Sequence, residues 1–253
     1  MLYTLVERIC ADIDTLPAAT TGEPQFAQQI REAAADTVES LIKRNRERGN
    51  KKVTQDDAVE ALTLLAFTFV RSIPRTARAM VGKLRDCQVH AARRCAIASV
   101  LAYLVQPHDI IPDDAPGYYG YLDDAIILHA GLVEYLDTLP EGVSSFSPNL
   151  VNLALCLAPE HARPALQSAV SSMSQLIQIL NIMGPEIAEQ TLAQIVANPL
   201  LPFTVTAPPG FSPHPARDYG GGHWSGGNSF EGNNVILGGV GSLLINGGPF
   251  IPG

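Results

Sequence analysis

The chain has 253 residues, of which 46% are hydrophobic and 17% charged, and its formal net charge is −8. This length can bury the core of one large domain or two small ones. The start lacks a secretory signal pattern, and no apolar run reaches the ~18–20 residues that cross a bilayer. We therefore expect a cytoplasmic protein, and a place at a membrane surface or within a larger assembly is compatible with this expectation.

The charge is unevenly distributed along the chain. Residues 1–94 hold 15 Lys and Arg against 12 Asp and Glu, whereas residues 95–253 hold 2 against 13. Such a basic block can attract an anionic partner or the chain's own acidic half, and the second reading is slightly favoured. The four cysteines form no C-x-x-C pair, so zinc and thioredoxin-like chemistry lack support and reduced, buried thiols are expected.

The N-terminal part predicts helices over 2–14 and over 25–48, the second from apolar residues that recur at steps of three and four. Its last turns are basic, as the helix dipole prefers. The candidate anion-binding residues, for a nucleic acid or more favourably an anionic membrane surface, are Lys43, Arg44, Arg46, Arg48, Lys51 and Lys52.

Thr54 to Asp57 has the spacing of a capping box and predicts a helix over 55–72. Pro74 marks a break between helices, and residues 75–105 favour one long helix that becomes apolar toward its end. Further helices are expected over 121–139, 148–157, 162–183 and 185–197. The fold class is therefore mainly α, a multi-helix bundle with an Asp/Pro-rich corner in a helical hairpin.

The last 52 residues differ in composition, with 13 of the 21 glycines and 7 of the 19 prolines between 202 and 253. Two apolar triplets around a Gly-rich turn are compatible with a short β-hairpin. We expect this tail to dock on a partner or on another subunit. The candidate partner-binding residues are Trp224, Val235, Ile236, Leu237, Leu243, Leu244 and Ile245.

The segment PHDIIPDDAPGYYGYLDDAIILHA, from Pro107 to Ala130, clusters aspartates between two apolar runs. One interpretation is structural, since carboxylates cap turns and satisfy free N–H groups in the first turn of a helix. The other is a divalent-cation site, because hard cations prefer several oxygen ligands. Its candidate ligands are Asp109, Asp113, Asp114, Asp123 and Asp124.

The structural interpretation is favoured, because the spacing matches no EF-hand loop. The two histidines of the segment form no H-E-x-x-H pair either. His129 falls on the apolar series of the following helix and is expected to line the core with a hydrogen-bond partner.

Residues 101–132 resemble the YkvA-like family, a bacterial domain of unknown function (domain of unknown function 1232). The resemblance rests on P-x-D-x-I-P-D, an aromatic and Gly linker and G-x-x-D-D between two apolar helices. It implies a helical hairpin, often suspected of membrane association, and no established reaction. The matching positions are Pro107, Asp109, Ile111, Pro112, Asp113, Gly120, Asp123 and Asp124.

These features predict a basic helical part over 1–94, the YkvA-like hairpin with its following helices over 95–200, and the tail over 201–253. The preferred hypothesis is a non-catalytic helical scaffold or interaction protein without a cofactor. It binds a protein partner or itself. Two alternatives stay open: a divalent-metal-dependent hydrolase using the Asp cluster, and binding of a nucleic acid or an anionic membrane through the basic region.

Overall fold

The fold is seen in a computed structural model. It describes residues 1–16, 24–47, 52–106, 110–112, 118–135, 148–201, 203–206, 211, 234–237 and 244–245. Helices dominate these residues, which confirms the mainly α class. In chain order they are α1 (Leu2–Asp14), α2 (Pro24–Ala33), α3 (Ala35–Glu47), α4 (Gln55–Arg71), α5 (Ile73–Arg85), α6 (Ala91–Tyr103), α7 (Tyr121–Tyr135), α8 (Pro148–Leu155), α9 (Arg163–Met183) and α10 (Pro185–Ala197).

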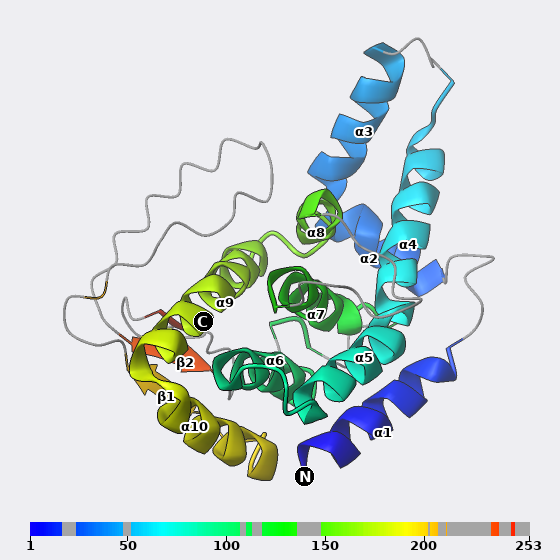
Figure 1. The fold of residues 1–253 in the computed structure, drawn as a ribbon. Coiled ribbons are helices and arrows are strands. Elements are labelled where there is room, and N and C mark those ends of the chain that lie inside the picture. Colours follow the sequence, from blue (N-terminus) through cyan, green and yellow to red (C-terminus); the bar gives the residue numbers. More distant parts are fainter. Residues whose placement is uncertain are drawn as a thin grey trace.

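Helix α7 occupies the centre of the bundle (Figure 1). It contacts α4, α5, α6, α8 and α9, and every side chain from Leu122 to Leu132 is buried. A helix that is apolar all round can be stable only where neighbours cover every face. The family-like segment thus supplies the central helix of the core, and the boundary expected between residues 94 and 95 falls inside α6.

The predicted capping box is present at the start of α4. The Asp57 N–H donates to the Thr54 hydroxyl oxygen at 3.1 Å, and the Thr54 N–H donates to the Asp57 carboxylate at 2.8 Å. These two bonds satisfy donors that a helix start leaves open. The sequence pattern therefore located this helix start correctly.

The single helix expected over 75–105 is wrong, because the chain turns between α5 and α6. Asp86 ends α5 in an extended conformation, and its carboxylate accepts a hydrogen bond from the Gln88 N–H at 3.0 Å. His90 then caps α6, since its ring nitrogen Nδ1 accepts from the Ala92 N–H at 3.3 Å. Side chains that bond the local backbone compete with a continuous helix.

The helix expected over 25–48 is likewise divided, into α2 and α3. The carbonyl of Ala33 at this junction accepts a hydrogen bond from the Arg163 guanidinium at 3.0 Å. The Thr37 hydroxyl, one turn further on, donates to the Cys156 carbonyl at 3.0 Å. Contacts with the α8–α9 turn thus fix the junction, after which α3 projects from the body beside the start of α4 (Figure 1).

Three short strands follow the helices: β1 (Phe203–Thr206), β2 (Asn234–Leu237) and β3 (Leu244–Ile245). They form an antiparallel sheet in the order β1-β2-β3, with Val235 opposite Ile245 and Ile236 opposite Leu244. Strands β2 and β3 lie where the sequence allows a hairpin. Both β1 and β3 contact α9 of the same chain, so these strands lie against the chain's own helical body.

Gly131 lies on α7 where this helix faces α6. A Cβ atom at this position would lie 2.8 Å from Cγ2 of Val100. We therefore expect Gly131→Ala to destabilise the fold by about 1–3 kcal/mol, because the extra methyl group has no space. Urea unfolding followed by circular dichroism measures this loss.

Gly82 provides the matched control, because a Cβ added there, on α5, meets nothing within 4 Å. Gly82→Ala should stabilise the fold by about 0.5–1 kcal/mol, the ordinary gain of alanine over glycine in a helix. Equal effects of the two substitutions would contradict the close packing of α6 and α7.

Candidate functional site

The corner between α6 and α7 is held by the carboxylate of Asp123. Its Oδ2 atom accepts a hydrogen bond from the Tyr103 hydroxyl at 2.8 Å and another from the Ile111 N–H at 2.9 Å. The Tyr103 oxygen in turn accepts from the Ile110 N–H at 3.3 Å. One carboxylate in the first turn of α7 thus joins the end of α6 to the linker.

Burial controls the ionisation of this carboxyl group. Asp123 is 0% exposed, and burial raises its pKa to about 7, although the hydrogen bonds from Ile111 and Tyr103 act in the opposite direction. A carboxyl group with such a pKa can hold or release a proton near neutral pH. In this conformation, however, the side chain lies away from solvent and therefore from any dissolved substrate.

The predicted set of metal ligands is described only in part. Asp124 is buried beside Asp123 in the first turn of α7. The other three aspartates, Asp109, Asp113 and Asp114, lie outside the described residues. Within the described ranges, no group of three or more His, Cys, Asp or Glu side chains could hold a metal ion.

His129 lines the core, as its place in the apolar series predicts. Its Nε2 atom lies 2.6 Å from the Ser72 hydroxyl, and its ring centroid lies 4.4 Å from that of Phe69. Burial lowers the pKa of His129 to about 3, so the imidazole is neutral at physiological pH. This histidine therefore contributes packing and a hydrogen bond between α4 and α7.

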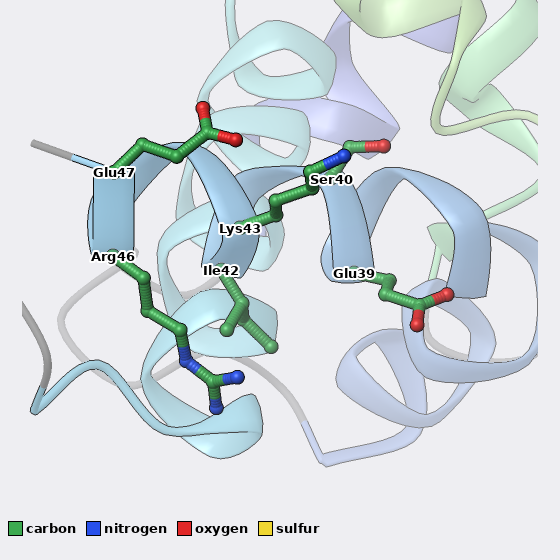
Figure 2. A pocket seen from close by; sticks show the side chains of 6 residues that line it. All are labelled: Glu39, Ser40, Ile42, Lys43, Arg46 and Glu47. Carbon is green, nitrogen blue, oxygen red and sulfur yellow. The ribbon is translucent and has the colours of Figure 1, made fainter.

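The candidate anion-binding residues lie on the projecting part of the molecule. Lys43, Arg44 and Arg46 are exposed on the last turns of α3, and Lys52 is exposed before α4. Arg48 and Lys51 lie outside the described residues. A hollow of about 550 Å³ lies along α3. The residues that line it are Glu39, Ser40, Ile42, Lys43, Arg46 and Glu47 (Figure 2).

Cations elsewhere in the chain are used to join helices. Arg78 of α5 binds Glu7 and Asp14 of α1 at 2.6 and 2.8 Å. Arg94 of α6 binds Glu189 of α10 at 3.0 Å. This last pair joins the basic block to the acidic half, whereas the pairs of Arg78 lie within residues 1–94.

The candidate partner-binding residues of the tail are divided between the sheet and undescribed sequence. Val235, Ile236 and Leu237 lie in β2, and Leu244 and Ile245 form β3. Trp224 and Leu243 lie outside the described residues. The structure therefore gives the backbone path of these strands. Docking of the tail on a partner stays a prediction.

Sequence reasoning missed three residues that join separate parts of the fold: Tyr103, Ser72 and Arg163. Arg163 carried the clearest signal, because it is one of only two basic residues after Arg94 and begins a helix. A cation is unfavourable at a helix N-terminus. Such a placement indicates a role outside the helix, here with the carbonyl groups of other segments.

Together the fold and the corner define a class: a mainly α protein built around a buried helical hairpin whose linker is fixed by a carboxylate. Residues 93–130, which form most of that hairpin, match the family described as "Protein of unknown function (DUF1232)". The resemblance inferred from residues 101–132 is thereby confirmed for this segment.

The other comparisons add no named relative. No curated protein and no solved structure matches the chain. In the part of the chain that the structure describes, no helix has the length and apolarity needed to cross a membrane.

Proposed function

We propose that this chain is a non-catalytic helical scaffold or interaction protein. The observation that carries the proposal is the use made of Asp123: its carboxylate is fully buried and bonds the linker at Ile111 and the end of α6 at Tyr103. A carboxyl group committed to internal hydrogen bonds positions helices. It does not contact a substrate from that position.

The environment of His129 supports the same proposal. The imidazole is 0% exposed and bonds Ser72. A general base needs to reach the proton that it removes from a substrate, and His129 instead joins two core helices. Of the described acid-base groups of the family segment, Asp123 and His129 therefore serve the packing of the bundle.

The tail supplies the interaction part of the proposal. Strand β2 joins β1 by antiparallel pairing, and β1 and β3 lie on α9. These contacts support docking of the tail's strands on α9 of the same chain. Binding of a partner protein or a second subunit through Trp224 and the strands is proposed beyond that.

The metal-dependent alternative is tested by titrating chelator-treated protein with Mg²⁺, Mn²⁺ and Zn²⁺ in a calorimeter. We expect no saturable binding of one ion per chain, and the same result for Asp113→Asn and Asp124→Asn. Elemental analysis of the protein before chelation is the second measurement. Exposed Asp12 on α1 provides the control Asp12→Asn.

Stoichiometric binding of one ion that is lost in Asp113→Asn and kept in Asp12→Asn would overturn the proposal. Several oxygen ligands around one ion are the usual arrangement for water activation. In that case the proposal of a metal-dependent hydrolase would replace the proposal of a scaffold.

A further inference from the structure

The outer face of α3 is exposed, and the fold uses few of its groups. Val38 is buried, and Ile42 is partly buried at the edge of the core. Glu39, Lys43 and Arg46 are exposed beside the hollow shown in Figure 2. Because residues three and four positions apart lie on one side of a helix, Glu39, Ile42, Lys43 and Arg46 form a continuous stripe.

Within the described ranges, the charged residues of this stripe form no ion pair. Glu39 and Lys43 are four residues apart, a spacing that permits a salt bridge. Among the residues that the structure describes, ion pairs join Arg31, Arg78, Arg94 and Arg163 to acids, and Glu39, Lys43 and Arg46 are not among the pairs. The stripe therefore presents both signs of charge to its surroundings.

We infer that this stripe binds the same stripe of a second copy of the chain, with the two α3 helices antiparallel about a two-fold axis. The order of the residues carries the inference. When Glu39 faces the second copy's Arg46, the axis passes between positions 42 and 43, and Arg46 necessarily faces the second copy's Glu39. A two-fold interface requires this kind of self-complementarity.

The centre of the stripe suits the same register. Ile42 then faces the second copy's Lys43, whose methylene groups can cover the apolar side chain while the ammonium group stays in water. The two Glu–Arg contacts lie on either side of this centre. Charge complementarity thus sets both the antiparallel direction and the register of the pair.

The position of α3 leaves room for such a pair. The helix projects from the body of the molecule (Figure 1), and Glu39, Lys43 and Arg46 on it are exposed. One helix of 13 residues is about 20 Å long. The interface therefore stays below the ~1,200 Å² of the smallest stable complexes, and the dimer is weak and salt-sensitive.

The competing partner is a nucleic acid or an anionic membrane, which the basic residues alone would favour. Glu39 and Glu47 stand within the same face as Lys43 and Arg46, and carboxylates repel phosphate groups. A face with alternating signs fits a second copy of itself better than a uniformly anionic surface. This inference goes beyond the scaffold proposal, since it does not depend on whether the Asp corner has a catalytic role.

Sedimentation equilibrium of the full chain in low salt tests the pairing. The weight-average mass should rise with concentration from 27.0 kDa toward twice that value. Glu39→Arg and Arg46→Glu should each weaken the dimer about tenfold, because each places like charges opposite one another twice. An equimolar mixture of the two variants should restore dimerisation, since one stripe is then cationic and the other anionic.

Matched controls use the same charge changes at exposed positions away from α3. Glu186→Arg on α10 and Arg8→Glu on α1 should leave the dimer unchanged, alone or mixed. Thermal melts establish that all variants are folded. Recovery in the mixture of α3 variants itself shows that both chains keep their structure.

Three results would overturn the inference. The first is a mass that stays at the monomer value up to about 0.5 mM, well above the micromolar range of specific complexes. The second is a dimer that the α3 variants do not weaken, or that their mixture does not restore. The third is a monomer that binds labelled duplex DNA or anionic vesicles and loses this binding in Arg46→Glu.

Discussion

Replacing Arg163 with methionine should destabilise the protein more than loss of any exposed ion pair. Its guanidinium donates to the carbonyls of Ala158, Ala33 and Cys156 at 2.9, 3.0 and 3.0 Å. It also binds the Asp36 carboxylate at 2.9 and 3.1 Å. Methionine keeps the packing volume but removes the donor of the Ala158 and Ala33 carbonyls, whereas the Cys156 carbonyl keeps its bond from Thr37. The loss costs on the order of 3 kcal/mol.

The measurements are urea and thermal unfolding, for which we expect a fall in melting temperature of about 6–12 °C. Hydrogen exchange should accelerate at the α2–α3 junction and in the turn before α9, because Arg163 joins these segments. Arg163→Lys should lose a large part of the same stability, since an ammonium group cannot reproduce the planar fork.

Arg31→Met is the control for an exposed pair. The side chains of Arg31 and Asp56 are 40% and 86% exposed, and exposed pairs contribute less than about 1 kcal/mol. Equal losses in Arg31→Met and Arg163→Met would contradict the role of Arg163 in joining helices. A normal melting temperature in Arg163→Met would contradict it as well.

Asp123→Ala is the second substitution with a large expected effect. It leaves the Tyr103 hydroxyl and the Ile111 N–H without their acceptor, at a cost of about 3 kcal/mol. Asp123→Asn should cost less, because an amide oxygen can still accept one of these bonds. Unfolding in urea, compared with the exposed control Asp12→Asn, measures both losses.

The pH dependence tests the ionisation of Asp123 directly. Burial raises its pKa from 3.8 to about 7 in the folded chain, so the folded state holds this proton more tightly than the unfolded state. The stability that the group contributes is therefore complete below about pH 4 and is lost as the pH rises toward 7. The asparagine side chain in Asp123→Asn does not titrate in this pH range.

The wild-type chain should accordingly lose stability relative to Asp123→Asn between pH 4 and 7. Comparing the two chains cancels the contribution of the other carboxyl groups to the pH dependence. One of these groups is Asp36, whose pKa is lowered mainly by its hydrogen bond with Arg163. A difference in unfolding free energy that does not change over this range would show that Asp123 keeps one protonation state throughout.

The sequence predicted the corner in outline. The position of Asp123 in the first turn of an apolar helix indicated a structural role, but its expected partners were N–H groups of that helix start and not the linker N–H of Ile111. The sequence did not indicate that Tyr103 would be the other partner. A hydroxyl group 20 residues away in the chain enters the corner only because α6 and α7 pack against each other.

By itself the sequence indicated where most helices lie. Apolar periodicity, prolines, glycines and the Thr54–Asp57 cap act over a few residues, so they can be recognised without knowing the fold. The largely apolar segment 122–132, whose residues are all buried in the structure, belongs to the core.

Only the tertiary structure decided the direction of the chain at its bends. The junction after Ala33 depends on a guanidinium 130 residues away, and no local pattern encodes such a contact. The same bend makes α3 project and exposes Glu39 and Arg46 together. Local sequence sets the charges of this face, whereas long-range hydrogen bonds set where it points and what it can meet.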